Sequence, residues 1–229
     1  MDYTVDELAK LIDYSLLSPN LTDAELESGI QTALDYDVAS ICIMPYYLRR
    51  CAAAVTGTEV KASTTIGFPH GAHTKAIKVA EAQQALEDGG EELDLVVNIG
   101  KVLSHDWNYV RDEVKDIVDL THQAGGKLKL IFENFYLNDD QKIRLCEMCG
   151  ELNVDWAKTS TGYAEGMGTM DDFALMIKHC PSHVQVKAAG GVPDLDTLLT
   201  IREMGLTRVG KRSVGILDEA QARLAAAPG

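Results

Sequence analysis

The sequence predicts an α/β protein, built as a single (β/α)8 TIM barrel with a short N-terminal helix. Short apolar runs rich in β-branched residues alternate with stretches of helical period along the chain. Strands that alternate with helices form a parallel sheet, because each parallel connection needs a crossover. Eight such units in 229 residues fit a compact barrel, whose usual length is about 250 residues. We expect one domain that spans residues 1–229.

Eight segments show the strand pattern. The first lies around Leu11–Asp13, directly after a short helix expected over Val5–Lys10. A doubly wound open sheet is the alternative, but no G-x-G-x-x-G motif follows this first strand, which disfavours the dinucleotide-binding form of that fold. The other seven expected strands are Val38–Ile43, Glu59–Ile66, Glu92–Val97, Lys127–Phe132, Val154–Ala157, Val184–Lys187 and Thr207–Val209.

Three helices have boundaries that the sequence marks. The alanine-rich segment Thr74–Asp88 is followed by Gly89 and Gly90, which are typical of a helix C-terminus. The segments Asp139–Cys149 and Asp194–Met204 each begin at an aspartate that can cap the free N–H groups of the first turn. These helices alternate with the strands as a barrel requires.

Composition narrows the range of partners. The chain has 21 Lys and Arg residues against 35 Asp and Glu residues, which gives a net charge of −14. Such a chain repels phosphate backbones and anionic lipids, and no local basic patch offsets the charge, so we expect neither nucleic acid nor membrane as a partner. Residues 1–7 are acidic, unlike a signal peptide, and no apolar run approaches the roughly 18 residues of a membrane span. A cytoplasmic location is expected.

The five cysteines point to reduced thiols, because their number is odd and they are scattered over a large domain. Cys146 and Cys149 have the spacing of a redox or zinc motif. They lie in a predicted helix, however, and no second cysteine pair completes a zinc site, so we interpret them as ordinary helix residues. Cys42 ends the second predicted strand, where it either lines a pocket or is a small buried apolar residue.

Ionisable side chains stand at or near the ends of several predicted strands, where TIM barrels hold their active sites. A lone lysine there most often extends to solvent. Two lysines at the ends of consecutive strands, together with an acid inside an apolar strand, would be costly to bury without partners or a function. We therefore interpret Lys158, Lys187 and Asp94 as a candidate catalytic set. The strand-end residues are Asp13, Asp94, Glu133, Lys158 and Lys187.

Two neighbouring lysines make one of them reactive. A free lysine has a pKa of about 10.4 and is an ammonium ion at neutral pH. A second cation nearby and partial burial both disfavour that charged form, so one lysine becomes a neutral amine. A neutral amine attacks a carbonyl and forms a Schiff base, which acts as an electron sink for breaking or forming a C–C bond. An aspartate in the same cavity can move the protons that these steps require.

Several motifs resemble those of deoxyribose-phosphate aldolases. The sequence D-W-A-K-T-S-T-G-Y at 155–163 is similar to the V-K-T-S-T-G-F of the Schiff-base strand in that family. Residues 186–192, V-K-A-A-G-G-V, resemble its V-K-A-A-G-G-I/V, and residues 92–100 resemble its E-I-D-M-V-I-N-I-G. Weaker likenesses occur at residues 12–17, 66–71 and 205–210. The likenesses follow the family's order from residue 12 to about residue 215.

The resemblance implies a class I aldolase on a TIM barrel, without a cofactor or a metal. Such an enzyme interconverts 2-deoxyribose 5-phosphate with acetaldehyde and glyceraldehyde 3-phosphate. By position, Lys158 forms the Schiff base, Lys187 lowers its pKa, Asp94 is the acid and base, and Asp13 supports the relay. A homo-oligomer, dimer or tetramer, is implied as well. The implied substrate-binding residues are Cys42, Thr161, Gly162, Gly190, Gly191, Gly210, Lys211, Arg212 and Ser213.

The sequence departs from the family pattern where the phosphate is expected to bind. Small hydroxyl residues usually follow the last strand, whereas this chain has Lys211 and Arg212 there. Pro193 replaces a common basic residue, and Glu165 interrupts a loop that is usually glycine-rich. Three readings stay open. The two basic residues bind phosphate directly, they face solvent, or together with Glu165 they belong to a pocket for a different aldehyde acceptor, either carboxylated or without a phosphate. Two further departures are Tyr14 and Asn134, where the family has His and Thr.

Two functions of other classes compete with the aldolase. A metal-dependent aldolase or hydrolase could use His70, His73, His105 and Glu133 as ligands, but no His-Glu-x-x-His arrangement is present. A non-catalytic binding barrel is the second, and the intact Lys158, Lys187 and Asp94 argue against it.

Overall fold

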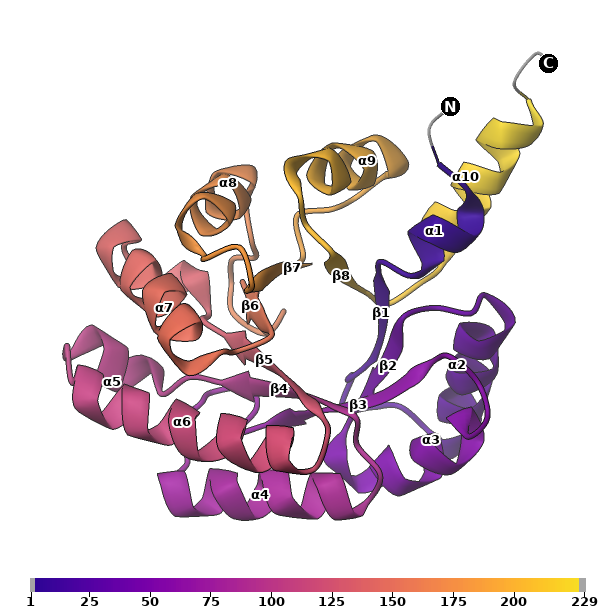
Figure 1. Cartoon of the computed structure of the whole chain (residues 1–229). Helices are drawn as coiled ribbons and strands as arrows, with labels where there is room; N and C mark the ends of the chain where they lie inside the picture. The colour runs from indigo at the N-terminus through magenta and orange to yellow at the C-terminus, as the bar shows by residue number, and fades with distance from the viewer. Residues whose placement is uncertain (1–2, 227–229) are drawn as a thin grey trace.

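Eight parallel strands close into a barrel in the order of the sequence, and β8 returns to pair with β1. The structure is a computed structural model that describes residues 3–226. Figure 1 shows the helices wrapped around the outside of the strands. The strands are β1 (Ile12–Leu16), β2 (Ser40–Ile43), β3 (Lys61–Ile66), β4 (Glu92–Val96), β5 (Lys127–Ile131), β6 (Trp156–Lys158), β7 (Gln185–Ala189) and β8 (Arg208–Lys211). The TIM-barrel prediction is confirmed.

Helices or helical turns follow the strands, as expected. α1 precedes the barrel, packs against α10 and places the two ends of the described chain side by side. The α-helices are α1 (Val5–Ala9), α2 (Asp23–Asp35), α3 (Leu48–Val55), α4 (Lys75–Glu87), α5 (Ile99–Leu103), α6 (Trp107–Gln123), α7 (Asp139–Leu152), α8 (Met170–His179), α9 (Leu195–Met204) and α10 (Gly215–Ala225), and two 3-10 turns are η1 (Pro45–Tyr47) and η2 (Asn134–Tyr136). None of the helices within residues 3–226 combines the length and apolar character that a membrane crossing requires.

The predicted cap residue is confirmed for α9 and wrong for α7. Asp194 caps α9, because its carboxylate accepts a hydrogen bond from the backbone N–H of Thr197 at 2.9 Å. The cap of α7 is Asn138 rather than Asp139: its side chain accepts from the N–H of Gln141, and the Gln141 side chain accepts from the N–H of Asn138. This reciprocal pair satisfies two free N–H groups at once.

Because side chains alternate along each strand, the structure has two buried regions: an apolar core between the strands and the helices, and the inside of the barrel. Residues such as Ile12, Leu93 and Leu130 point outward and form one apolar core with the inner faces of the helices. Their neighbours in sequence point into the barrel, because successive side chains of a strand face opposite sides. Most barrels fill this inner space with branched aliphatic side chains. Here the inward-facing set is polar and charged, and it is fully buried: Asp13, Ser40, Ser63, Asp94, Lys129 and Lys187 are at most 1% exposed.

A buried ion pair outside the barrel fixes the end of β4. Lys78 of α4 and Glu113 of α6 are both inaccessible to solvent, and Lys78 Nζ lies 2.8 Å from the Glu113 carboxylate. The same Nζ donates a hydrogen bond to the carbonyl oxygen of Val96 at 2.8 Å. Val96 lies two residues after Asp94, so this pair holds the strand that carries a candidate catalytic carboxylate.

Candidate active site

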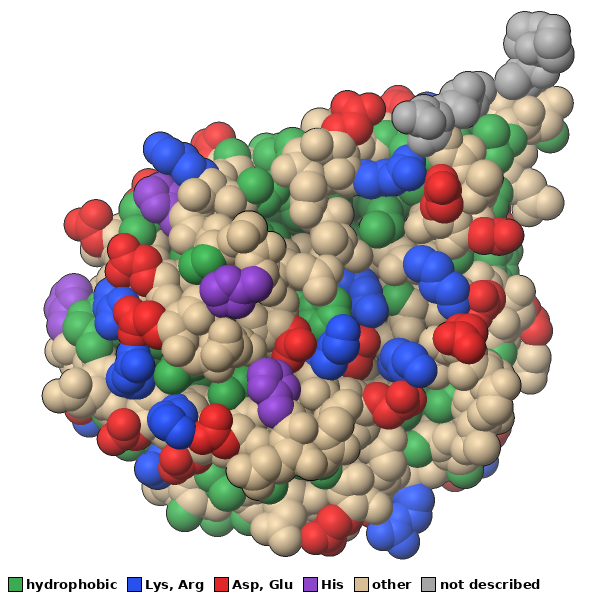
Figure 2. All heavy atoms as spheres, viewed as in Figure 1, with side chains coloured by type: hydrophobic (Ala, Val, Ile, Leu, Met, Phe, Trp, Pro, Cys, Tyr) green, Lys and Arg blue, Asp and Glu red, His purple; other side chains and the backbone are tan. Residues whose placement is uncertain are grey.

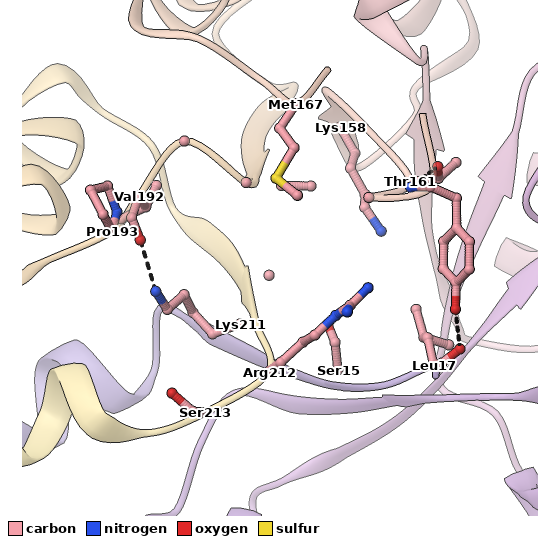
Figure 3. Close-up of a pocket in the computed structure, with 16 residues that line it drawn as sticks. Ser15, Leu17, Lys158, Thr161, Met167, Val192, Pro193, Lys211, Arg212 and Ser213 are labelled. Atoms are coloured by element: carbon pink, nitrogen blue, oxygen red, sulfur yellow. Dashed lines mark hydrogen bonds between the residues drawn. The ribbon is translucent and has the colours of Figure 1, made fainter. Parts of the chain in front are cut away.

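A cavity of about 590 Å³ opens at the carboxyl end of the strands. Figure 3 shows Lys158 extending into it, with Thr161 and Leu17 on one side and Val192, Pro193 and Lys211 on the other. Nine residues predicted from the sequence line the cavity: Lys158, Thr161, Gly162, Gly190, Gly191, Gly210, Lys211, Arg212 and Ser213. Acidic and basic side chains are interspersed over the face of the molecule in Figure 2, where no extended basic surface is seen.

The strand register brings the two lysines side by side. Lys158 ends β6, Lys187 lies in β7, and the two are paired across the ladder. Both point inward and are nearly buried, at 4% and 1% exposure. Asp94 lies opposite them in β4 and is inaccessible to solvent. The candidate catalytic set predicted from the sequence is therefore one cluster in the structure.

Asp94 contacts three lysines at once. One of its carboxylate oxygens accepts hydrogen bonds from Lys158 Nζ at 2.6 Å and from Lys187 Nζ at 2.9 Å. The other oxygen accepts from Lys129 Nζ at 3.0 Å. Asp13 continues the chain of charges, since its carboxylate lies 2.5 Å from Lys187 Nζ and 3.2 Å from Lys129 Nζ.

The cluster also contains Glu92, Lys129 and Arg208, which the sequence analysis did not identify as site residues. Lys129 in β5 lies 2.5 Å from Glu92, and Arg208 in β8 lies 3.1 Å from Glu92 and 2.8 Å from Asp13. A signal was present, because Glu92 shares the inward face with Asp94 and the run K-L-K-L-I places Lys129 on the inward side of its strand. Trp156 covers the Arg208 guanidinium, with 4.9 Å between the guanidinium carbon and the centre of its rings.

The cluster is balanced without Lys158. Within the described barrel interior, the three carboxylates of Asp13, Glu92 and Asp94 face the cations of Lys129, Lys187 and Arg208, and Lys158 is a fourth basic group. Burial alone would raise the pKa of Asp94. The nearby charges of Lys129, Lys158 and Lys187 outweigh burial and hold this pKa well below its usual value. A further buried ammonium finds no unmatched carboxylate among these three. Glu133, the other buried acid that feels the charge of Lys158, has its pKa raised by burial, so it is a weak counter-charge. Lys158 is therefore the group that loses its proton most readily.

The directions of the lysine pKa values agree with this balance. Burial, reinforced by the charge of Lys187, lowers the pKa of Lys158, although Asp94 opposes the shift. Burial also disfavours the charge on Lys187, but Asp13 and Asp94 together raise its pKa above the ordinary value. Lys187 is therefore the permanent cation and Lys158 the amine that is most easily neutralised. A neutral amine at a cavity wall can attack a carbonyl group.

Two glycines form the loop after β7. Gly190 and Gly191 have φ angles of +76° and +69°, a region that other residues rarely adopt. A Cβ on Gly191 would lie 2.1 Å from the carbonyl oxygen of Gly168, so this loop also packs directly against the loop after β6. Because glycines have no side chain, both residues present backbone along one wall of the cavity.

Lys211 and Arg212 have different surroundings. Lys211 Nζ donates a hydrogen bond to the carbonyl oxygen of Val192 at 2.7 Å, and burial lowers its pKa. Arg212 extends into the cavity toward Lys158 in Figure 3 and pairs with no carboxylate within residues 3–226. Lys211 therefore holds the loop after β7, whereas Arg212 is a cation at the cavity wall. Glu165 is exposed and does not line the cavity.

Two other predicted residues, Cys42 and Glu133, lie around the site. Cys42 is buried in β2, where burial raises the pKa of its thiol, and it does not line the cavity. Glu133 accepts hydrogen bonds from the N–H of Thr161 at 3.1 Å and from the Thr161 hydroxyl, and thereby fixes the start of the loop after β6. No group of three or more His, Cys, Asp and Glu side chains between residues 3 and 226 is placed to hold a metal ion.

Comparisons with known proteins agree with this geometry. The model of the DeoC/LacD family of aldolases matches residues 7–212. The chain belongs to this family. It is 60% identical over 224 residues to a deoxyribose-phosphate aldolase of Rhodopirellula baltica, covering 97% of this chain and 93% of the relative. A deoxyribose-phosphate aldolase of Caldicellulosiruptor saccharolyticus is 38% identical over 218 residues, covering 94% of this aldolase and 99% of the relative.

Solved structures give the same result. A deoxyribose-phosphate aldolase from Aeropyrum pernix, described as a unique tetramer, superposes on the chain with a TM-score of 0.88 at 29% identity. The match covers 96% of this chain and 93% of that structure. The aldolase QR15 superposes with a TM-score of 0.90 at 32% identity over 96% of this chain and 99% of its own. The fold and the enzyme class, a lyase of the aldolase type, are thus established.

Replacement of Lys187 by methionine tests the electrostatic arrangement. Only neutral Lys158 reacts with an aldehyde, and the positive charge of Lys187 lowers the pKa of Lys158. In Lys187→Met that repulsion is lost, so the pKa of Lys158 rises and the acidic limb of its reactivity moves to higher pH, by about one unit or more. The measurement is the rate at which acetaldehyde and cyanoborohydride modify Lys158, followed by peptide mass from pH 5 to 10. Lys127→Met, at the exposed start of β5, is the control; a Lys187→Met profile that superposes on it contradicts the assignment.

Proposed function

We propose that this aldolase cleaves 2-deoxyribose 5-phosphate reversibly to acetaldehyde and glyceraldehyde 3-phosphate through a Schiff base on Lys158. The observation that carries the proposal is the position of Lys158: it enters the cavity, contacts Asp94 at 2.6 Å, and has Lys187 as its neighbour in the strand ladder. The relatives from Rhodopirellula baltica and Caldicellulosiruptor saccharolyticus, both named deoxyribose-phosphate aldolases, support the choice of substrate. The whole chain, residues 1–229, acts as one aldolase domain.

The residues divide the chemistry between them. Neutral Lys158 attacks C1 of the open-chain sugar, and loss of water gives an iminium ion. Removal of the proton from the C3 hydroxyl breaks the C2–C3 bond, so C3 leaves as the aldehyde of glyceraldehyde 3-phosphate and C2 remains in an enamine. Protonation of C2 and addition of water release acetaldehyde and restore the amine. Asp94 accepts and returns protons, while Lys187 and Asp13 hold its charge and position.

The phosphate binds at the opposite end of the cavity from Thr161. The loop after β7 presents backbone at Gly190 and Gly191, and α10 begins at Gly215 without a side-chain cap on its first N–H groups. Such N–H groups favour an anion. Arg212, which has no carboxylate partner among residues 3–226, adds a full positive charge beside them. Lys211 contributes by fixing the Val192 carbonyl rather than by binding phosphate.

The proposal also includes a cytoplasmic location and assembly into a homo-oligomer. All five cysteines are free, which fits a reducing compartment such as the cytoplasm. Phe135, Tyr136 and Met170 expose 50%, 48% and 39% of their surface and offer apolar contacts for a second subunit. The tetrameric aldolase from Aeropyrum pernix supports a homo-oligomer here as well.

Turnover of 2-deoxyribose 5-phosphate beside unphosphorylated 2-deoxyribose tests the function. We expect acetaldehyde release to be much faster from the phosphate ester. Lys158→Ala should abolish release and also abolish borohydride trapping of acetaldehyde, whereas Lys127→Ala should retain both. Poor turnover of both sugars, with Lys158 still trapped by acetaldehyde, contradicts the proposed substrate and indicates an acceptor pocket remade for another aldehyde.

Arg212→Gln tests the phosphate contact. A charge-assisted hydrogen bond to phosphate contributes about 1.5–3 kcal/mol, so we expect kcat/KM for 2-deoxyribose 5-phosphate to fall by about tenfold or more. The unphosphorylated sugar should be cleaved at an unchanged rate. Arg144→Gln, at a surface arginine of α7 that pairs with Glu147 and Glu151, is the control. An equal loss on both sugars contradicts a role in phosphate binding.

A further inference from the structure

A second cavity lies behind the wall of the first. It has a volume of about 270 Å³, and Thr161 and Tyr163 line it as well as the cavity that contains Lys158. These two residues are therefore the partition between the cavities. The other residues around the second cavity are mainly apolar: Pro69, His70, Ile99, Leu103, Glu133, Tyr136 and Ala164.

Tyr163 is held in place although its side chain is 41% exposed. Its hydroxyl donates a hydrogen bond to the carbonyl oxygen of Leu17 at 2.5 Å, which joins the loop after β6 to the loop after β1. Its backbone N–H donates to the Thr161 hydroxyl oxygen at 3.0 Å, and its ring packs edge-on against Phe68 with centroids 5.3 Å apart. Two side-chain contacts thus fix the ring where the two cavities meet, and the backbone bond fixes the residue that carries it.

Glu133 fixes the position of Thr161, one of the two residues of the partition. Its carboxylate binds both the N–H and the hydroxyl of Thr161, and its backbone adopts a left-handed conformation with φ of +56°. A residue other than glycine is strained in that conformation, so it persists only where the surroundings demand it. The anchored carboxylate keeps Thr161, and through it Tyr163, in a fixed position.

The partition faces the carbonyl end of the substrate. In Figure 3, Lys158 lies between Thr161 and Leu17 on one side and the loop of Val192 and Pro193 on the other. With the phosphate at that loop and C1 on Lys158, the sugar chain runs away from Tyr163. Any further substituent on the carbon that bonds Lys158 must then point toward Thr161 and Tyr163. For acetaldehyde that substituent is hydrogen, whereas for a ketone it is carbon.

We propose that Tyr163 is a specificity-determining residue that restricts the donor to aldehydes, because its ring fills the space that the second alkyl group of a ketone would need. This inference rests on the proposed function. A ketone forms its imine on Lys158 by the same steps, addition of the amine and loss of one water, so the restriction is one of shape. Removal of the ring joins the two cavities and gives an alkyl group access to the apolar walls of Ile99, Leu103 and Ala164.

The test compares donors in single-turnover trapping. Wild type, Tyr163→Ala and Tyr163→Val are each treated with acetaldehyde, acetone or 2-pentanone and with borohydride, and the rate of modification of Lys158 is followed by peptide mass. We expect the ratio of ketone to acetaldehyde rates to rise by about tenfold or more in Tyr163→Ala, with a smaller rise in Tyr163→Val. The valine variant decides the question if the alanine variant does not fold.

Tyr136→Ala is the matched control, because Tyr136 lines the second cavity and not the one that contains Lys158. It enlarges that cavity without opening the partition, so its ratio should equal that of the wild type. An unchanged ratio in the Tyr163 variants, or an equal rise in Tyr136→Ala, overturns the proposal. Failure of the wild type to trap acetaldehyde on Lys158 is a different result, which refutes the proposed function and this inference with it.

Discussion

The carboxylate of Asp94 lies within 3.0 Å of the side-chain nitrogens of three lysines in the interior of a closed barrel. Removing such charges from water is costly unless each is matched. Asp13, Glu92 and Asp94 match Lys129, Lys187 and Arg208, and the remaining basic group is Lys158. Its reactivity is therefore a consequence of the whole inward-facing set of side chains, and one neighbouring lysine supplies only part of the effect.

The parallel barrel provides this arrangement because the ladder registers place charges from six strands at related heights. Asp94 is paired with Lys129 across β4 and β5, Lys158 with Lys187 across β6 and β7, and Lys187 with Arg208 across β7 and β8. Around this rigid set, the loops after β6, β7 and β8 build the binding surface. The strands thus position the reactive amine, and the loops decide which substrate reaches it.

Much of the fold could be predicted from alternation alone. The eight strands appear where expected with shifts of a few residues, and Asp194 caps its helix. The cap of α7 was assigned one residue too late, because Asn138 competes successfully with Asp139 through its reciprocal bond to Gln141. Boundaries of this kind depend on which side chain reaches an N–H group, and the apolar pattern does not contain that information.

The residues nearest the cavity, Lys158, Lys187 and Asp94, could be predicted from the sequence, whereas Lys129, Glu92 and Arg208 deeper in the barrel could not. Lys158, Lys187 and Asp94 stand out because they interrupt apolar strands. Alternation in K-L-K-L-I puts both Lys127 and Lys129 on the inward face, so the sequence indicates the face but not that Lys129 alone is buried. The different surroundings of Lys211 and Arg212 depend on the position of the Val192 carbonyl in another loop. Contacts between distant segments of the chain decide both cases.

The pKa of Lys158 in two opposite charge variants tests the account most directly. Lys129→Met removes a cation from the cluster and Glu92→Gln removes a carboxylate, and neither residue forms an ion pair with Lys158. If charge balance governs the amine, the pH at which Lys158 becomes trappable by acetaldehyde rises in Lys129→Met and falls in Glu92→Gln. A shift in the same direction in both variants, or no shift in either, would contradict the account.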